Sequence, residues 1–391
     1  MPPTAIYASR ILTPQEEIND GIIVVEASRI IAVGHRDEVR VPAGAVDYVA
    51  TGMTVVPGFV DVHLHGAGGH DVMEGNARAL DRIASTIARY GTTSFVATTI
   101  SAPTEETCKS LQGIARYIRS REKADGEPKL AAEVLGIHLE GPFLSKVRRG
   151  VHPVDAIARP SVELLEKFVK AADGFVKLLT LAPELPGAIE VIESAVAAGI
   201  VVGMGHTDAD YEQAMAGMGA GVRHATHMFN AMRPFAHRDP GVIGAVLTEP
   251  DVTAEVIADL VHVAGPAIQV LIGSKGFDTV LLMTDSMAAT GMPDGNYRLG
   301  DFDVSVRDGV ARNFEGKLAG STLTLDRALR NVVGLGVPLL EAVRMATVLP
   351  ARRLGLAGRK GILAVGADAD IVALTPDLHV AAVMTRGAGL V

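Results

Sequence analysis

Histidine and carboxylate side chains recur in this sequence where they could bind a divalent metal ion. His63 and His65 are two positions apart in the run Asp-Val-His-Leu-His. Because alternate side chains of an extended strand point to one face, both imidazoles can reach the same ion. The further candidates each follow a different predicted strand: Glu140, His206, His227 and Asp285. Imidazole and carboxylate ligands suit Zn²⁺, and also Fe²⁺, Co²⁺ or Mn²⁺.

Bringing such residues into one pocket requires a fold in which distant strand ends meet. Predicted strands alternate with helical segments at residues 54–60, 94–99, 133–138, 176–181, 200–204, 222–225, 253–257 and 279–283. This alternation predicts an α/β fold, and eight is the strand count of a closed parallel (β/α)₈ TIM-like barrel, although a doubly wound sheet alternates in the same way. In a barrel the strand ends converge on one mouth, where all the candidate ligands would lie.

The two ends of the chain differ from the middle. Short β-rich segments with turn signals occupy residues 5–12, 21–25, 29–33, 371–374 and 380–385. They predict a small discontinuous β-sandwich domain formed by both termini, at residues 1–55 and 355–391, beside a catalytic barrel at 56–354. The connection at 229–247 is expected to be irregular, and 289–320 to form a small β insertion before a helix.

Each candidate ligand also has an ordinary structural explanation. A lone His-x-His pair is common, Glu140 could pair with an arginine, and Asp285 could cap a helix. The metal interpretation is favoured because the candidates fall at the same end of different strands. Of the remaining polar residues, His224 is expected to be a hydrogen-bonded core histidine, and Asp61 is a candidate for orienting an imidazole.

Charge and cysteine content exclude several classes of protein. The formal net charge of −9 argues against nucleic acid or an anionic membrane as a partner. A single cysteine, Cys108, excludes intramolecular disulfides and indicates a reducing compartment. No segment reads as a signal peptide, and no apolar run approaches the ~20 residues that span a bilayer. We therefore expect a soluble cytoplasmic protein that acts on a small molecule.

Longer motifs around the candidate ligands resemble those of a known family. The run VPGFVDVHLHG, from Val56 to Gly66, resembles the first-strand signature of the amidohydrolase superfamily. The motifs HLEGPF at His138, GHTDA at Gly205 and HMFNAM at His227 are similar to those of the N-acetylglucosamine-6-phosphate deacetylase family. So are IADLVH and LAGSTL nearer the C-terminus, and the resemblance covers essentially the whole chain.

The resemblance implies hydrolysis of the acetamido group of N-acetyl-D-glucosamine 6-phosphate to D-glucosamine 6-phosphate and acetate, with a metal-activated water as the nucleophile. It implies one or two ions per subunit, most commonly Zn²⁺. The metal ligands found throughout the family match Glu140, His206 and His227, whereas His63 and His65 match a second position that some members have lost. Asp285 would act as general acid and base.

The resemblance also implies a set of substrate contacts. His152 matches a histidine that contacts the sugar and polarises the carbonyl, although without the resemblance it reads as an exposed loop residue. Asn230 and the backbone N–H of Ala231 match phosphate contacts, and Arg238 matches a phosphate-binding arginine donated by the neighbouring subunit of a homodimer. The remaining substrate-lining residues implied are Val151, His262, Leu318, Ala319 and Gly320.

Two other functions remain open at this point. A cyclic-amidase or dihydroorotase-like hydrolase could use the same scaffold, but many such relatives carry a bridging lysine at the end of strand four. This chain has Leu179-Thr180-Leu181 there, so Glu140 would take the bridging role. A non-catalytic paralogue is disfavoured because the candidate ligands and Asp285 are all present. The sequence does not separate the glucosamine substrate from its galactosamine epimer.

Overall fold

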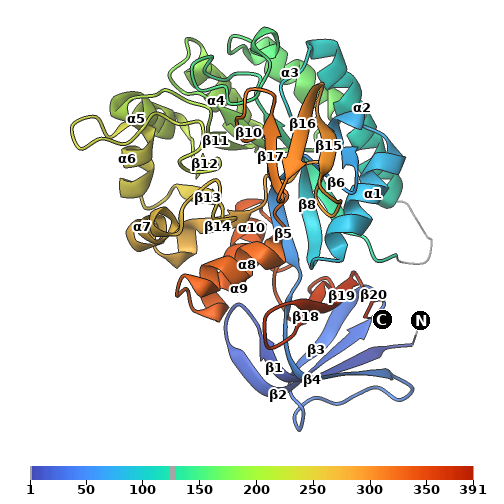
Figure 1. Ribbon diagram of the computed structural model, residues 1–391. Helices are drawn as coiled ribbons and strands as arrows, with labels where there is room; N and C mark the ends of the chain where they lie inside the picture. The colour runs from blue at the N-terminus through green and yellow to red at the C-terminus, as the bar shows by residue number, and fades with distance from the viewer. Residues whose placement is uncertain (1, 123–128, 391) are drawn as a thin grey trace.

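The computed structural model describes residues 2–122 and 129–390. Its centre is a parallel sheet of eight strands that follow one another in chain order (Figure 1). They are β5 (Phe59–Leu64), β8 (Thr92–Thr99), β9 (Glu133–Glu140), β10 (Val176–Leu181), β11 (Val201–Met204), β12 (His224–Ala225), β13 (Thr253–Ile257) and β14 (Val280–Met283). The ring closes between β14 and β5, where Leu64 and Ser286 form a parallel bridge. The predicted (β/α)₈ barrel is confirmed.

Helices cover the outside of the barrel. They are α1 (Ala77–Ala88), α2 (Thr104–Glu122), α3 (Val162–Ala171), α4 (Ala188–Ala197), α5 (Tyr211–Ala220), α6 (Gly241–Thr248), α7 (Gly265–Lys275), α8 (Leu325–Gly334), α9 (Leu339–Ala346) and α10 (Val348–Arg353). In α1, Asn76 caps the first turn by accepting from the backbone N–H of Ala79, and buried Leu80, Ile83 and Ile87 recur at helical spacing. Within the described ranges, no helix is long and apolar enough to cross a membrane.

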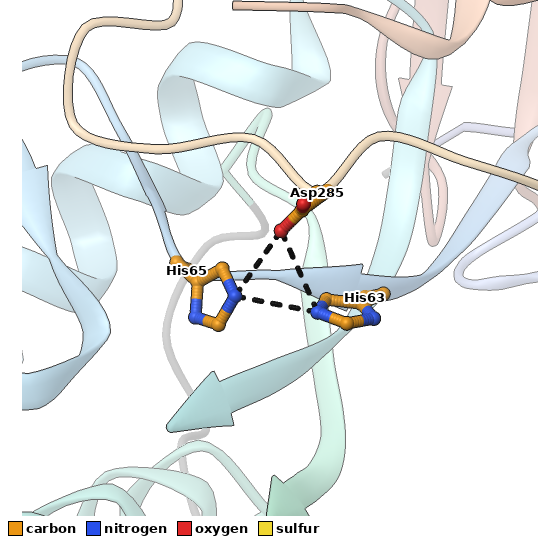
Figure 2. A group of neighbouring side chains, drawn as sticks. All are labelled: His63, His65 and Asp285. Atoms are coloured by element: carbon orange, nitrogen blue, oxygen red, sulfur yellow. Dashed lines mark hydrogen bonds and ion pairs between the residues drawn. The ribbon is translucent and has the colours of Figure 1, made fainter. Parts of the chain in front are cut away.

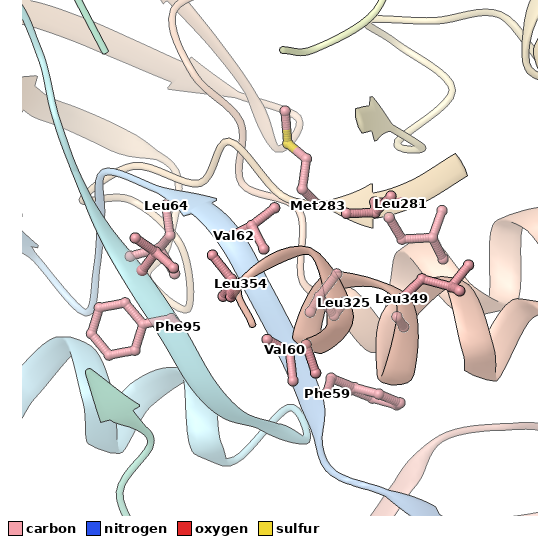
Figure 3. Packing of buried hydrophobic residues seen from close by; sticks show 14 of the residues in the cluster. Phe59, Val60, Val62, Leu64, Phe95, Leu281, Met283, Leu325, Leu349 and Leu354 are labelled. Carbon is pink, nitrogen blue, oxygen red and sulfur yellow. The ribbon is translucent and has the colours of Figure 1, made fainter. Parts of the chain in front are cut away.

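The core fixes the strand that carries the first candidate ligands. Val60, Val62 and Leu64 alternate along β5 with polar Asp61 and His63, and the whole strand is buried. Since alternate side chains face opposite sides, the apolar set packs outward while the polar pair lines the barrel interior. Figure 3 shows the apolar set beside side chains of α8, α10 and β14. Burial of each such side chain stabilises the fold by about 1.5–3 kcal/mol.

A second sheet joins both ends of the chain. Its strands lie in the order β20-β19-β18-β4-β1-β2-β3. Their bounds are β1 (Thr4–Leu12), β2 (Glu17–Glu26), β3 (Arg29–His35), β4 (Val46–Pro57), β18 (Ile371–Leu374), β19 (Val380–Thr385) and β20 (Ala388–Gly389). Antiparallel pairing of β18 with β4 brings the C-terminal strands to the N-terminal ones. The predicted β domain of both termini is confirmed, whereas its boundaries at residues 55 and 355 stay a prediction.

The chain passes from the β domain to the barrel at one glycine. The predicted strand 54–60 spans two strands, because β4 ends at Pro57 and β5 begins at Phe59. A Cβ on Gly58 would lie 2.1 Å from Thr93 Oγ1, so a larger residue would force β5 and β8 apart. The junction between the two strands therefore has room only for a glycine.

Two segments near the barrel mouth differ in how well they were predicted. The connection expected to be irregular at 229–247 contains α6, whose glycines and β-branched residues have low helix propensity. Burial of Val242, Ala245 and Val246 stabilises this helix in spite of its sequence. The predicted β insertion is present as β15 (Gly295–Leu299), β16 (Phe302–Arg307) and β17 (Val310–Asn313), an antiparallel sheet.

Candidate metal centre and active site

Two groups of potential metal ligands meet at the mouth of the barrel. The first group contains His63, His65 and Asp285, whose ligand atoms all lie within 4.8 Å of one another (Figure 2). The Nε2 atoms of the two histidines are 3.3 Å apart. Asp285 Oδ1 lies 3.5 Å from His63 Nε2 and 3.2 Å from His65 Nε2. The first and last strands of the barrel thus place three donors around one point.

The second group contains Glu140, His206 and His227, whose ligand atoms likewise lie within 4.8 Å of one another. Glu140 Oε1 lies 3.1 Å from His206 Nε2 and 3.0 Å from His227 Nε2. The other oxygen, Oε2, lies 3.2 Å from His65 Nε2 in the first group. The carboxylate of Glu140 therefore lies between the two groups, where a bridging ligand would be needed.

Three of these residues have an unusual backbone conformation. His206, His227 and Asp285 have φ values of 50°, 32° and 51°, in the left-handed region that L residues rarely adopt. Each lies just after the end of its strand, so the turn redirects the side chain toward the mouth. Such a conformation costs roughly 1–2 kcal/mol per residue. At Asp285 it is held by backbone hydrogen bonds to His63 and from Ser321, at 2.9 and 2.7 Å.

Hydrogen bonds on the outer ring nitrogens indicate which imidazole atoms carry protons. The Nδ1 atoms of His63, His65 and His206 face, respectively, the Glu255 carboxylate at 3.2 Å, the Thr98 carbonyl at 3.2 Å and the Arg148 carbonyl at 2.9 Å. Since these oxygens only accept, Nδ1 carries the proton and Nε2 presents a lone pair to the mouth. Lone pairs that face carboxylate oxygens repel one another unless a cation lies between them. The donor set therefore fits a divalent cation.

The ionisation states of the two groups differ. Burial lowers the pKa of His65, but hydrogen bonds with Asp285 and Glu140 outweigh it and raise this pKa to about 9, so the first group holds protons that a divalent cation would displace. Burial raises the pKa of Asp285, but the hydrogen bond with His65 and the charge of His63 outweigh it and leave this pKa below its ordinary value. Burial lowers the pKa of His206 to about 4, so its ring is neutral near pH 7. An ionised carboxylate and a neutral imidazole are the forms that bind metal ions.

His152 lies inside the site rather than in an exposed loop. Its side chain is 2% exposed, and its ring centroid is 4.5 Å from that of His206. Because the backbone N–H of Ser101 donates to His152 Nδ1 at 3.2 Å, the ring proton is on Nε2. That Nε2 lies 3.4 Å from Glu140 Oε2, so it can donate a hydrogen bond at the mouth.

The loop after β12 carries the predicted phosphate contacts. Asn230 Nδ2 donates to the carbonyl oxygens of His227 and Met228 at 3.4 and 3.3 Å, beside the second ligand group. Ala231 follows with a left-handed φ of 50°. Arg238 is exposed and forms no hydrogen bond or ion pair with the described residues of its own chain. The structure thus brings two of the three predicted contacts to the mouth and leaves Arg238 at the surface.

The remaining predicted lining residues surround a neighbouring cavity or the last strand. His262 is held by a hydrogen bond between its Nδ1 and Asp259 Oδ2, at 2.7 Å, and it faces a cavity of about 210 Å³ that Ser321 also lines. Gly320 has φ 61°, and a Cβ there would lie 3.1 Å from the carbonyl oxygen of Asp285. The list is completed by half-buried Val151 and Leu318 and by buried Ala319.

Sequence reasoning missed Glu255 and misassigned Asp61. Glu255, in the middle of β13, is fully buried and accepts from His63 Nδ1 and from His224 Nε2. A glutamate inside a central barrel strand is the signal that could have revealed it, because a buried charge requires partners. The carboxylate of Asp61 instead accepts from the His63 backbone N–H and from Thr284 Oγ1. The prediction of His224 as a hydrogen-bonded core residue is confirmed.

Comparison with known proteins agrees with this geometry. The amidohydrolase family model matches residues 54–388. An N-acetylglucosamine-6-phosphate deacetylase of Vibrio furnissii is 38% identical, over 97% of this chain and 93% of that protein. An N-acetylgalactosamine-6-phosphate deacetylase of Escherichia coli O157:H7 is 35% identical over 98% of both. An aspartate-to-alanine variant of the Mycobacterium smegmatis N-acetyl-D-glucosamine-6-phosphate deacetylase, solved with N-acetyl-D-glucosamine-6-phosphate, is 39% identical with a TM-score of 0.92 over 100% of both chains. The chain therefore belongs to the amidohydrolase family, and within it to the N-acetylglucosamine-6-phosphate deacetylase family.

Proposed function

We propose that this chain hydrolyses the acetamido group of N-acetyl-D-glucosamine 6-phosphate. The amide C–N bond breaks, the oxygen of water bonds to the carbonyl carbon, and acetate and D-glucosamine 6-phosphate are released. The observation that carries the proposal is the convergence at one barrel mouth of two ligand groups, one of which contains Asp285. The named substrates of the relatives in Vibrio furnissii and Mycobacterium smegmatis support the choice of sugar phosphate.

Two cation positions follow from the ligand groups. Glu140, His206 and His227 would hold one divalent ion, and His63 and His65 with Asp285 would hold a second. We propose Zn²⁺ because the donors are nitrogen and carboxylate oxygen, a set that Fe²⁺, Co²⁺ and Mn²⁺ also accept. A bound ion of this kind lowers the pKa of water from ~15.7 toward ~7 and polarises a carbonyl oxygen.

Asp285 and His152 have complementary roles in this proposal. The lowered pKa of Asp285 keeps its carboxylate ionised, so it can accept a proton from the attacking water. The same carboxyl group then passes that proton to the sugar nitrogen as the C–N bond breaks. His152 Nε2–H donates to the acetyl oxygen, where negative charge develops in the transition state. Ser101 holds the His152 ring in the required tautomer.

The phosphate would bind at the loop after β12, across a subunit boundary. We place it on the Asn230 side chain and the backbone N–H of Ala231, with Arg238 supplied by the neighbouring subunit of a homodimer. The exposure of Arg238 and its lack of partners among the described residues support an intermolecular role. Phe235, 56% exposed in the same loop, offers apolar surface for such a contact. Val151, His262 and residues 318–320 would line the sugar.

Metal removal tests the proposed chemistry. We expect acetate release from N-acetylglucosamine 6-phosphate to fall at least about 100-fold after chelation and to return when Zn²⁺ is added. Acetate is measured by a coupled assay, and metal content is measured on the same samples. Full activity in protein freed of metal would contradict the proposal. The galactosamine epimer, assayed in parallel, decides which of the two sugars named for the relatives is preferred.

Replacement of Arg238 by methionine tests the phosphate contact. We expect KM for the phosphorylated sugar to rise about 10- to 100-fold, the worth of a charge-assisted hydrogen bond, with little change in kcat. The unphosphorylated sugar should be hydrolysed at the same low rate by both proteins. Arg40→Met, at another exposed arginine, is the matched control. Equal wild-type rates on the two sugars would overturn the assignment of a phosphate site.

Hybrid dimers test the subunit from which Arg238 comes. Coexpression of Arg238→Met with Asp285→Asn chains produces hybrids in which one site has both intact residues if Arg238 acts across the interface. At substrate concentrations well below the wild-type KM, where the Arg238→Met sites are nearly silent, about a quarter of the wild-type rate should then return in a random mixture of dimers. A hybrid mixture whose rate at that substrate concentration does not exceed that of its parents would place Arg238 in its own subunit's site.

A further inference from the structure

Glu255 is a buried carboxylate that the proposed reaction does not use. It lies in β13, beneath the ligand groups, and its residue exposure is 0%. A lone carboxylate is costly to bury, so its surroundings must supply hydrogen-bond donors. Both carboxylate oxygens of Glu255 have such a donor: His224 Nε2 lies 2.8 Å from Oε1, and His63 Nδ1 lies 3.2 Å from Oε2. The His227 backbone N–H is a third donor, 3.3 Å from Oε2.

These contacts determine the tautomer of His63. One oxygen of Glu255 faces the His224 ring, and the other faces the His63 ring and the His227 backbone N–H, so Glu255 accepts on both sides. His63 Nδ1 must then carry a proton, and His63 Nε2 must present its lone pair to the first ligand group. His224 is itself held by Thr253, whose Oγ1 is 2.7 Å from His224 Nδ1. The chain Thr253, His224, Glu255 and His63 therefore leads from the barrel wall to the metal centre.

The acceptor on Nδ1 of His63 differs from the acceptors on Nδ1 of His65 and His206. The outer nitrogens of His65 and His206 donate to backbone carbonyl oxygens, at 3.2 and 2.9 Å. A carboxylate on the outer nitrogen makes an imidazole more basic and a stronger ligand than a carbonyl does. The geometry thus strengthens one donor of the first group selectively. In the second group, His206 donates to a neutral carbonyl, and His227 Nδ1 has no hydrogen-bond partner among the described residues.

We propose that Glu255 is the positioning residue that gives the His63, His65 and Asp285 position its affinity for a cation. Glu255, which contacts a ligand but is not one itself, then determines whether the centre holds one ion or two. This inference rests on the proposed metal centre and adds a residue that touches neither the ion nor the substrate. Its failure would leave the deacetylase proposal intact, because the second ligand group does not depend on Glu255 for its imidazole tautomers.

Glu255→Gln tests the inference with a change of almost no volume. The glutamine amide has one acceptor oxygen and one NH₂ group in place of two acceptor oxygens, so it cannot accept from both His224 and His63. If its NH₂ group faces His63 Nδ1, the proton of His63 moves to Nε2 and removes the lone pair. We expect the dissociation constant of Zn²⁺ at the first group to rise about 10- to 100-fold. Metal bound per chain, counted after equilibration with Zn²⁺ and a competing chelator, should fall from two to one.

Three further variants make the result decisive. Glu133→Gln changes another largely buried glutamate, at the start of β9, and should retain both ions even if it lowers stability. His65→Ala removes a ligand directly and fixes the one-ion reference. Glu255→Asp keeps the charge but shortens the side chain by one methylene group, so its carboxylate lies farther from His63. It should weaken cation binding at the same position, and it provides the test if the glutamine variant fails to fold. Wild-type Zn²⁺ affinity and stoichiometry in both Glu255 variants would overturn the inference, whereas a wild-type chain that binds no divalent ion would overturn the proposed function.

Discussion

Asp285→Asn is expected to lower kcat for N-acetylglucosamine 6-phosphate by about 10²- to 10⁴-fold, the usual worth of a general acid–base group. Asparagine keeps the size of the side chain but cannot accept a proton from water or return one to the leaving nitrogen. The position of Asp285 Oδ1, 3.2 Å from His65 Nε2, also places it among the candidate ligands of the first group. The measurement is therefore kcat and KM together with metal content per chain.

Two controls separate proton transfer from metal loss. Assays at saturating Zn²⁺ should leave the defect of Asp285→Asn in place, since added metal cannot replace a proton carrier. Asp278→Asn changes an exposed aspartate just before the opposite end of β14 and should leave kcat at its wild-type value. A rate for Asp285→Asn within a few-fold of wild type would exclude the acid–base role.

Lys360→Met is expected to lower the free energy of unfolding by about 3–5 kcal/mol, the cost of leaving buried charges without their partner. The Lys360 side chain is 0% exposed, and its ammonium lies 2.6, 2.9 and 2.7 Å from carboxylate oxygens of Glu133, Asp368 and Asp370. Burial lowers the pKa of Lys360, but the three carboxylates outweigh it and raise that pKa, so the ammonium stays charged. Removing it leaves carboxylates that repel one another between β9 and the segment before β18.

Urea unfolding monitored by circular dichroism measures this loss. Lys317→Met is the matched control, because Lys317 is 53% exposed and its ion pair with Glu315 lies at the surface. Such exposed pairs contribute about 0–1 kcal/mol, so the control should unfold close to the wild-type midpoint. A Lys360→Met protein that unfolds at the same urea concentration as the control would show that the buried cluster contributes nothing to stability.

The barrel was predictable because its strands are short, apolar and regularly spaced. The bounds predicted for 176–181 and 253–257 match β10 and β13 in the structure. Helix α6 was missed because its stability comes from burial, which local propensity does not contain. The junction at Gly58 was missed for a related reason, since the constraint is the side chain of Thr93 on a neighbouring strand.

The candidate ligands were predictable because each ends a strand, and strand ends share a mouth. Glu255 was not, although it was inside a strand whose bounds were correctly predicted. The apolar residues of a segment predict a strand, but they carry no information about the contacts of a single charged residue within it. Its partners, His63 and His224, come from two other strands, and only the closed barrel brings the three together.

The closure of the barrel between β14 and β5 determines when the first ligand group is complete. A nascent chain contains Glu140, His206 and His227 well before Asp285 is synthesised. The donors of the first group come from the two strands that close the ring, so they can meet only when the last strand reaches the first. A domain generally folds as a unit, so the first group is complete only in the closed barrel. A cation bound by His63, His65 and Asp285 would therefore link the first strand of the barrel to the last. Binding at this position would then indicate that the barrel has closed.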